Sequence, residues 1–305
     1  IGFGLLVMLA AGIAVGYYGL SLSIEFTGGS VSKVQFQEVE RPNVTALQST
    51  VSELKFVNRP EIRPIGDKEV SIRTKEITQD QYEQLVSKLR SAYSTDKVSE
   101  DQVLNKRGFS RVGPAISEEL RQRAIIGLSI VAVAIIGFIA LVFRKASYPV
   151  PSVFYGLSAI LALVHDILIP VGVFAYLGHL GLTEIDVLFI VALLSILGLS
   201  VNDTIVVFDR VRENLRLYGT DQFERIVQMS LRQTLLRSIN TSLTLLLVLV
   251  PIFLFGGQSV KYFALALTIG TVAGAYSSIF LASSTIVVLY RMLRRRRRGQ
   301  VYQES

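Results

Sequence analysis

The 305-residue sequence contains no cysteine, which excludes disulfide bonds and metal sites built from thiolates. That absence says little about the compartment in which the protein works. The hydrophilic stretch at about residues 25–120 also has no histidine, no pair of carboxylates at a spacing suited to catalysis and no phosphate-binding loop. We therefore expect this stretch to bind or to act as a lever, and we expect neither an enzymatic activity nor a bound cofactor.

Hydrophobic residues, by contrast, are abundant. They make up 50% of the chain, and the mean hydropathy of +0.48 is high for a soluble domain of this size. They gather in six stretches, each near the ~20 residues that a helix needs to cross about 30 Å of hydrocarbon. This distribution predicts a polytopic α-helical membrane protein with six transmembrane helices. The stretches are residues 2–22, 124–143, 150–177, 187–208, 235–255 and 262–290.

The first stretch lies next to the start of the chain, which begins at Ile1 without a methionine, so we expect the true N-terminus to lie upstream. This stretch has neither the basic region nor the small-residue cleavage site of a signal peptide. Five later stretches, and a direct continuation into a folded segment, favour a retained membrane anchor.

Positive charges are divided unequally between the two sides of the predicted membrane. Loop 178–186 has no lysine or arginine and loop 256–261 has only Lys261. Because short basic loops stay in the cytoplasm, we expect both termini to be cytoplasmic. The basic positions are Arg144 and Lys145 after the second stretch, Arg210, Arg212, Arg216, Arg225 and Arg232 after the fourth, and Arg291 and Arg294 to Arg298 after the sixth.

The sequence thus divides into four predicted parts. Residues 1–24 are a first transmembrane helix, 25–120 an extracytoplasmic α+β domain, 121–293 a five-helix transmembrane bundle and 294–305 a basic tail. Because the tail directly follows a membrane span, we expect it to contact anionic lipid or a cytoplasmic partner, and we expect no nucleic-acid binding.

The hydrophilic segment has the order strand, helix, strand, strand, helix, strand. Its clearest element is the helix at 78–93, which begins at Thr78 and carries an apolar stripe from Tyr82 to Leu89. This order is typical of the split βαβ, ferredoxin-like arrangement. The predicted strands are 31–37, 56–64, 68–74 and 101–111, and the predicted helices are 43–55 and 78–93.

Two short motifs join this segment to the membrane spans. The motif "IEFTGGS" holds Gly28 and Gly29, which can take turn conformations that other residues disfavour. The motif "VGPAISEEL" holds Gly113 and Pro114, and proline suits the first turn of a helix. We expect hinges or structural turns here, although two ordinary linkers would have the same turn chemistry.

Asp203 lies within an apolar stretch, where a charged side chain costs about 2.5–3.5 kcal/mol at a helix centre. It falls six residues past the midpoint of 187–207, about 9 Å towards the cytoplasm. At this depth the carboxylate must be neutral, paired or beside a hydrated cavity. Arg237 enters the membrane from the same side, so it either meets Asp203 or snorkels to the headgroups.

Three further polar residues are candidates for an ion pathway. Asn202 adjoins Asp203. Asp209 lies at the membrane boundary, where a solvated helix end or a partner for the basic loop is the plainer interpretation. Asp166, in the third stretch, is alternatively a helix-packing residue whose carboxylate is satisfied by hydroxyl groups.

Three classes of protein use a carboxylate within the membrane. An ion-coupled transporter uses it as a protonation or cation site, and a structural subunit uses it to join helices. An intramembrane aspartyl protease uses two, and Asp166 with Asp203 would qualify geometrically. That class also needs a glycine-rich loop around its second aspartate, which "SVNDT" does not provide.

Six motifs follow one another along nearly the whole chain. They are "FTGG" (26–29), "VGP" with "EEL" (112–120), "ALVHD" (162–166), "GLSVNDTIVVFDRVRENLR" (198–216), "SLRQTLLRSINTS" (230–242) and "LFGG" (254–257). In this order and spacing they resemble the SecF family, the smaller half of the bacterial SecD/SecF accessory complex of the protein-export channel. The long motif around Asp203 is highly specific, whereas each short motif alone is weak.

The resemblance implies a half of the resistance-nodulation-division type, with six spans and an outer domain after the first. SecD would supply the other six spans. It also implies a multi-pass protein of the bacterial inner membrane that uses the proton gradient, or sodium in some members, to help draw polypeptide across the membrane. The implied partners are SecD, the SecYEG channel, the translocating polypeptide and membrane lipids.

The resemblance also implies roles for individual residues. Asp203 matches the family's ion-pathway aspartate, Arg237 the arginine of the same relay and Asp209 a second acidic position. Glu25 stands where relatives commonly have aspartate before "FTGG". The other essential aspartate of the relay belongs to SecD, so this chain holds only part of the relay.

A stand-alone transporter of small molecules or lipids from the same superfamily is the alternative function. Such transporters usually carry both halves and larger outer domains on one chain, and this chain carries neither. The sequence leaves H⁺ and Na⁺ both open as the coupling ion, because a carboxylate with nearby hydroxyl groups suits either.

Overall fold

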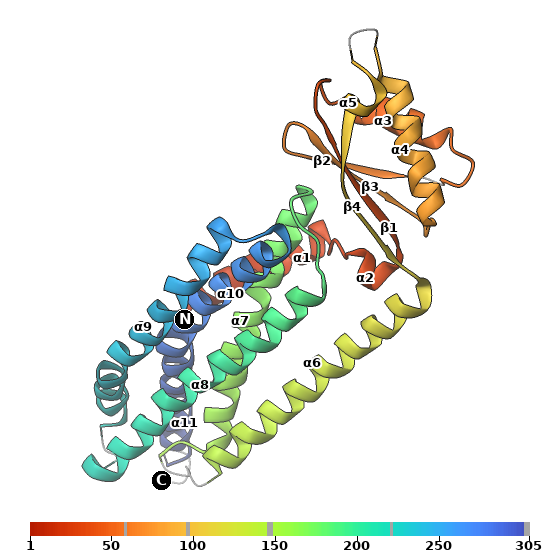
Figure 1. Ribbon diagram of the computed structural model, residues 1–305. Coiled ribbons are helices and arrows are strands. Elements are labelled where there is room, and N and C mark those ends of the chain that lie inside the picture. The colour runs from red at the N-terminus through yellow and green to blue at the C-terminus, as the bar shows by residue number, and fades with distance from the viewer. Residues whose placement is uncertain (58–59, 96–97, 145–148, 220–221, 302–305) are drawn as a thin grey trace. The chain divides into compact units, whose positions relative to one another are not determined.

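The structure, a computed structural model, describes residues 1–57, 60–95, 98–144, 149–219 and 222–301 (Figure 1). Lys145 and the side chains of Arg295 to Arg298, which the sequence assigns to basic regions, lie outside the described residues. The chain forms two compact units. The helical unit comprises Ile1–Leu20, Ile126–Tyr176 and Leu188–Ser305, and the α+β unit comprises Ser21–Ile125 and Leu177–Val187.

Long apolar helices make up the helical unit. Within the part of the chain that the structure describes, five helical segments are long and apolar enough to cross a membrane, whereas α1 is a shorter apolar helix of 17 residues. The chain is therefore a multi-pass membrane protein, as its hydropathy predicts. The helices are α1 (Gly2–Tyr18), α6 (Pro114–Phe143), α7 (Ser152–His179), α8 (Val187–Tyr218), α9 (Phe223–Phe255), α10 (Gln258–Tyr276), the π-helix η1 (Ser277–Ala282) and α11 (Ser283–Val301).

The helices α8 and α9 extend well beyond the predicted spans 187–208 and 235–255. Their additional turns are polar and are joined by hydrogen bonds, such as the one that Asn214 Nδ2 donates to Ser230 Oγ at 2.8 Å. A run of apolar residues predicts only the part of a helix that lies in the hydrocarbon, so the polar turns were not predicted.

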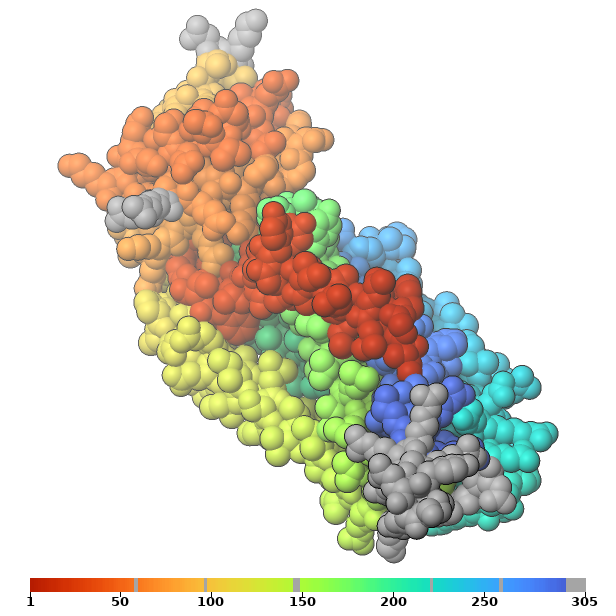
Figure 2. Space-filling view, turned by 180° about the vertical axis from the view of Figure 1, so that it is seen from behind, coloured from red at the N-terminus to blue at the C-terminus, as the bar shows by residue number. Residues whose placement is uncertain are grey.

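Aromatic side chains form part of the core of the helical unit. The rings of Phe143 on α6, Tyr155 on α7 and Phe208 on α8 contact one another, with centroids 5.3–5.6 Å apart. The helix α1 packs closely on α7, because a Cβ at Gly172 would lie only 2.7 Å from Ala11. Figure 2 shows α1, in red, on the surface of the helical unit.

The helix α6 presents an apolar surface. Only 6% of its most apolar stretch is buried inside the chain. Ile126, Ile130 and Val133, for example, are 56%, 62% and 70% exposed. In a membrane protein such side chains contact lipid or another subunit, because water would penalise a surface of this kind.

The α+β unit contains a four-stranded antiparallel sheet in the order β2-β3-β1-β4. Two helices, α3 and α4, share one hydrophobic core with it, which includes Phe36, Leu47, Ile72 and Leu85. The elements are α2 (Ile24–Thr27), β1 (Gly29–Phe36), α3 (Val44–Ser52), β2 (Glu61–Ile65), β3 (Glu69–Thr74), α4 (Gln79–Tyr93), α5 (Glu100–Val103) and β4 (Leu104–Val112).

The helix α4 agrees closely with its prediction. Thr78 is its N-cap, and its hydroxyl accepts a hydrogen bond from the backbone N–H of Gln81. The buried residues of this helix are those of the predicted apolar stripe, from Tyr82 to Leu89. A local cap and a helical period of apolar residues are sufficient to predict this helix.

Other boundaries differ from the predictions. The strand predicted at 101–111 begins only at Leu104, because the preceding residues form α5, which is closed by a capping box between Ser99 and Gln102. The strand predicted at 56–64 begins at Glu61, and residues 58 and 59 lie outside the described part. The first helix ends at Tyr18, before Gly19 with a φ of 70°, rather than at residue 22.

Candidate ion site

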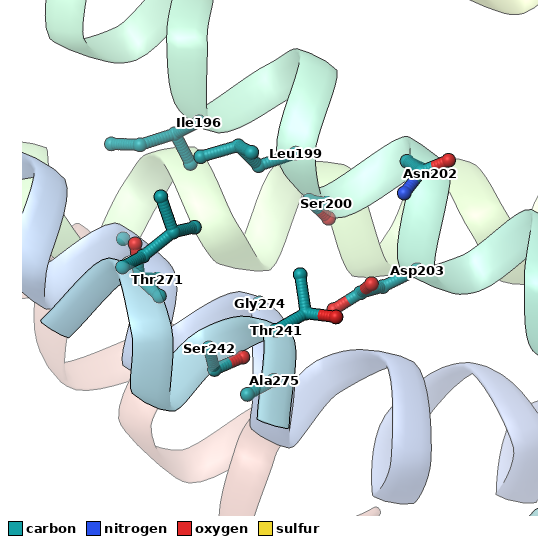
Figure 3. A pocket seen from close by; sticks show the side chains of 12 residues that line it. Ile196, Leu199, Ser200, Asn202, Asp203, Thr241, Ser242, Thr271, Gly274 and Ala275 are labelled. Atoms are coloured by element: carbon teal, nitrogen blue, oxygen red, sulfur yellow. The ribbon is translucent and has the colours of Figure 1, made fainter. Parts of the chain in front are cut away.

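A small cavity opens between α8, α9 and α10 in the helical unit (Figure 3). Water-sized molecules have about 30 Å³ there, enough for about one water. Hydroxyl, amide and carboxylate groups line it beside aliphatic side chains. The lining residues are Ile196, Leu199, Ser200, Asn202, Asp203, Thr241, Ser242, Leu245, Gly270, Thr271, Gly274 and Ala275.

Asp203 is the only carboxylate in this lining. It lies on α8, one turn after Ser200, so both side chains face α9 and α10. The side chain is partly buried, and within the described part of the chain it forms no hydrogen bond or ion pair. Of the three states that the sequence allows for this carboxylate, the geometry favours the one beside a polar cavity.

Arg237, on α9, is exposed rather than packed against Asp203. Between the described residues, no ion pair shorter than 4.0 Å joins the two side chains. Even so, the charges of Arg237 and Asp166 are near enough to act on Asp203. The structure therefore brings Asp203 and Arg237 into electrostatic range but not into direct contact.

Thr271 adds an unpaired hydroxyl to the cavity. Its Oγ1 atom is buried and has no hydrogen-bond partner among the residues described here. A buried hydroxyl without a partner is costly, so it is suited to bind a water or an ion that enters the cavity. The sequence did not single out Thr271, because one threonine in an apolar helix is not a distinctive signal.

Asp166, on α7, is completely buried and well supplied with partners. Its Oδ2 accepts hydrogen bonds from the hydroxyls of Ser200 and Ser277, the latter at 2.7 Å. Its Oδ1 lies 2.8 Å from Nδ1 of His165. Asp166 thus has the hydroxyl partners that a helix-packing carboxylate would have, and it joins α7, α8 and η1.

The π-helix η1 supplies one of these hydroxyls. Single turns of π-helix are rare and often lie at functional sites. Here the turn begins at Ser277, and Ser283 Oγ donates to the carbonyl of Ser278, five residues earlier, at 3.1 Å. This π-turn cannot be predicted from the sequence, because it has the same apolar composition as the α-helix around it.

The remaining ion-pathway candidates are Asn202 and Asp209, both on α8. Asn202 lines the cavity but is exposed. Asp209, six residues after Asp203 on α8, is exposed as a solvated end residue would be. In the described ranges no ion pair links Asp209 to the basic loop, whose Arg210 pairs with Glu213 at 2.6 Å.

The junction residues adopt the turn geometry that the sequence predicts. Gly28 and Gly29 have φ values of 70° and 116°, which L-residues rarely adopt. A Cβ on Gly29 would lie 2.6 Å from the carbonyl oxygen of Thr74. Pro114 is the first residue of α6, directly after Gly113.

One carboxylate, one amide and several hydroxyl groups make up the polar part of this site. Among the residues that the structure describes, no group of three or more histidine, aspartate or glutamate side chains is placed to hold a metal ion. The arrangement of Asp203, Thr271 and the neighbouring hydroxyls is instead suited to bind a proton, a water or a weakly held monovalent cation.

The chain is similar to known proteins over most of its length. Residues 93–292 match the family model described as protein export membrane protein SecD/SecF, C-terminal. The protein translocase subunit SecF of Thermobaculum terrenum is 41% identical over 302 residues, which cover 93% of this chain and 89% of that protein. The SecF subunit of Anaerolinea thermophila is 37% identical over 286 residues, with the same two coverages of 93% and 89%.

Solved structures agree with this assignment. The crystal structure of SecDF, a translocon-associated membrane protein from Thermus thermophilus, has a TM-score of 0.78 and 30% sequence identity. The match covers 95% of this chain but only 37% of the SecDF chain. The chain therefore belongs to the SecD/SecF family of protein-export membrane proteins, as a member of its SecF branch.

Proposed function

We propose that this chain is the SecF-type subunit of a bacterial protein-export machinery, which works with SecD to promote the passage of polypeptides across the membrane. The relatives are named protein translocase subunits. This chain matches only 37% of the SecDF chain, so the rest of SecDF is long enough to contain a second half. We propose SecD, the SecYEG channel, the exported polypeptide and membrane lipids as the partners.

The single observation that carries a gradient-driven mechanism is the position of Asp203. This carboxylate lies on a membrane helix, lines a small polar cavity and has no bonded partner in the described part of the chain. A structural carboxylate would be bonded as Asp166 is. An unbonded one can gain and lose a proton, or hold a cation, with few other bonds to break.

In this mechanism H⁺ or Na⁺ is the coupling ion, and no enzymatic step or cofactor takes part. Asp203 takes up the ion, and the fixed positive charge of Arg237 helps to release it. Asn202 and the hydroxyls of the cavity guide the ion. Asp166 closes the cavity on the side of α7, where it accepts the hydrogen bond from Ser200. Asp209 would act six residues further along the same helix, nearer the cytoplasm.

We further propose six membrane spans, with α1 as the first. Its 17 residues rise about 26 Å, close to the hydrocarbon thickness. Both termini would then be cytoplasmic and the α+β unit would lie outside the cell membrane. The sheet order β2-β3-β1-β4, with two helices on one core, supports a ferredoxin-like domain.

The test is to reconstitute the chain with its SecD partner and the channel in vesicles, and to measure export under a pH gradient or a sodium gradient. We expect one gradient to stimulate export above the ATP-driven level and the other to have little effect. If neither gradient stimulates export, the proposed ion coupling is wrong.

A further inference from the structure

The turn before α8, residues 183–186, is paired with the rest of the α+β unit through its backbone. The N–H of Ile185 donates to the carbonyl of Ser21 at 2.7 Å, and the N–H of Ser23 donates to the carbonyl of Ile185 at 2.9 Å. Leu22 and Ile185 thereby form a parallel β-bridge. This turn, which we call the pre-α8 turn, is thus a built part of the α+β unit.

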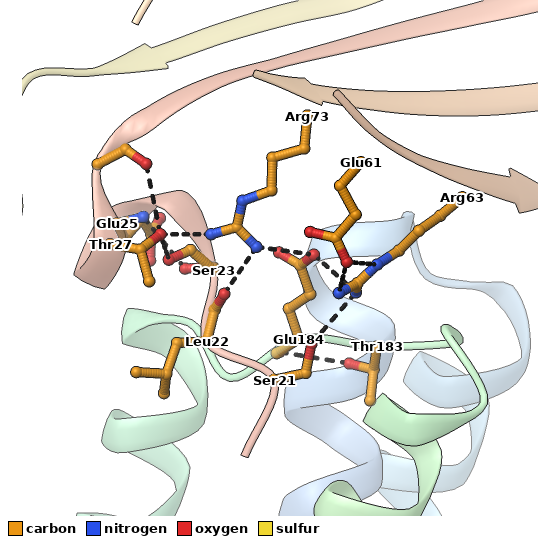
Figure 4. A network of polar contacts seen from close by, with 11 residues as sticks. Ser21, Leu22, Ser23, Glu25, Thr27, Glu61, Arg63, Arg73, Thr183 and Glu184 are labelled. Carbon is orange, nitrogen blue, oxygen red and sulfur yellow. Dashed lines mark hydrogen bonds and ion pairs between the residues drawn. The ribbon is translucent and has the colours of Figure 1, made fainter. Parts of the chain in front are cut away.

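Two arginines from the sheet hold the same turn by its Glu184 side chain (Figure 4). Nη1 of Arg63, on β2, lies 2.9 Å from Oε1 of Glu184, and Nη1 of Arg73, on β3, lies 3.4 Å from it. Arg73 also donates to the carbonyl of Leu22 at 2.9 Å. Because β2 and β3 are neighbouring strands, the sheet holds Glu184 from two fixed points.

Glu25 holds the helix itself. Its Oε2 accepts a hydrogen bond of 2.7 Å from the backbone N–H of Val187, the first residue of α8. The first N–H groups of a helix have no partner within it, and a negative charge there also suits the helix dipole. Glu25, from α2, therefore caps a helix that begins 162 residues later in the chain.

The boundary between the two compact units falls directly after this cap, between Val187 and Leu188. The helix α8 continues without interruption from Val187 to Tyr218. Asp203 follows Val187 by sixteen positions, which is about 24 Å along the helix axis. Other helices also cross between the units, but α8 is the helix that bears Asp203.

We propose that Glu25 and Glu184 are positioning residues that fix the start of α8 to the α+β unit, so that movement of this unit is transmitted along α8 to Asp203. This inference rests on the proposed function, because it takes Asp203 as the carboxylate that couples the ion gradient to export. Neither glutamate contacts the ion; both act through the helix.

The test uses the full chain, reconstituted with its SecD partner and the channel in vesicles. Glu25→Ala and Glu184→Ala should each lower gradient-stimulated export about fivefold, the change in an equilibrium that loss of a helix cap typically produces. ATP-driven export without a gradient, and assembly with the partner, should stay at the wild-type level. The matched control is Glu83→Ala, which removes an ion pair with Lys106 in the same unit but away from the pre-α8 turn.

An engineered disulfide tests whether the alanine variants lose the coupling along α8 or only lose stability. It can be introduced without competing pairings, because the sequence has no cysteine. Leu22 and Ile185 form a β-bridge, and bridged strands lie about 4.8 Å apart, a distance that a disulfide can span. We therefore replace both residues by cysteine, as Leu22→Cys and Ile185→Cys. In the Glu25→Ala background, oxidation should restore gradient-stimulated export and reduction should abolish the rescue.

Three results would overturn the inference. They are wild-type export in both alanine variants, an equal loss of ATP-driven export, and failure of the disulfide to rescue. In each case, loss of gradient-stimulated export in Asp203→Asn would leave the proposed function standing. Wild-type export in Asp203→Asn would overturn the proposed function itself.

Discussion

The hydroxyl of Ser200, on α8, donates a hydrogen bond to Oδ2 of Asp166, on α7. Ser200 also lines the cavity that contains Asp203, so a single side chain separates the buried carboxylate from the cavity. These two aspartates of the helical unit differ in their bonding: Asp166 accepts hydrogen bonds on both oxygens, and Asp203 has no bonded partner in the described ranges.

Ser200→Ala should destabilise the helical unit by about 0.6–1.7 kcal/mol, the range found for hydrogen bonds between membrane helices. Asp166 would keep Ser277 and His165 as partners, so the protein should still fold. The measurement is unfolding of the purified chain in detergent. Ser195→Ala is the control, because among the described residues Ser195 bonds only to the carbonyl of Val191, within its own helix. Equal losses in both variants would contradict this assignment.

Arg237→Lys should impair gradient-driven export, and Arg237→Met should abolish it, while both variants still assemble with SecD. Lysine keeps the charge but lacks the planar fork of donors, and methionine lacks the charge as well. Export into vesicles under a gradient measures the effect. Arg232→Met, on the same helix, should be silent. A wild-type rate in Arg237→Met would leave Arg237 as a simple helix anchor.

Gly29→Ala should destabilise the α+β unit by about 1–3 kcal/mol, because an alanine would be strained at a φ of 116° and would collide with the carbonyl of Thr74. Export should suffer more than membrane insertion. Gly108→Ala provides the control, since a Cβ there meets nothing within 4 Å. The measurement is the melting temperature of each variant in thermal unfolding. Equal melting temperatures for Gly29→Ala and Gly108→Ala would refute a structural role for this turn.

Glu184 should make stability depend on pH. Burial raises the pKa of the Glu184 carboxyl above its ordinary value, and Arg73 and Arg63 only partly offset this. Glu61 adds to the rise, and Lys33 opposes it. A raised pKa in the folded state gives stability that is fully present below the ordinary value and is lost as pH rises through the raised one.

Glu184→Gln removes this dependence. The melting temperature of the wild type relative to the Gln variant should therefore fall as pH rises from about 4.5, the ordinary glutamate value, towards neutrality. Glu83→Gln is the control with the opposite sign, because the hydrogen bond from Lys106 lowers the pKa of Glu83. A difference that stays constant with pH would contradict the raised pKa of Glu184.

The sequence predicted the elements whose signals are local. Thr78 and the apolar stripe of α4 lie within one helix, and Asp203 stands out because its neighbours are apolar. The contacts of Glu184 were missed, because Arg63 and Arg73 lie 121 and 111 residues away in the chain. A single sequence holds no signal for such distant pairs, and the cap of α8 by Glu25 escaped for the same reason.

The central claim is that Asp203 couples the ion gradient to export, and Asp203→Asn tests it most directly. The amide has nearly the same volume and can form hydrogen bonds, so expression and assembly with SecD should be unchanged, yet it cannot be ionised. The measurement is export by the reconstituted complex with and without a gradient. The account predicts that Asp203→Asn keeps the ATP-driven rate and loses all stimulation by the gradient; full stimulation in this variant would contradict it.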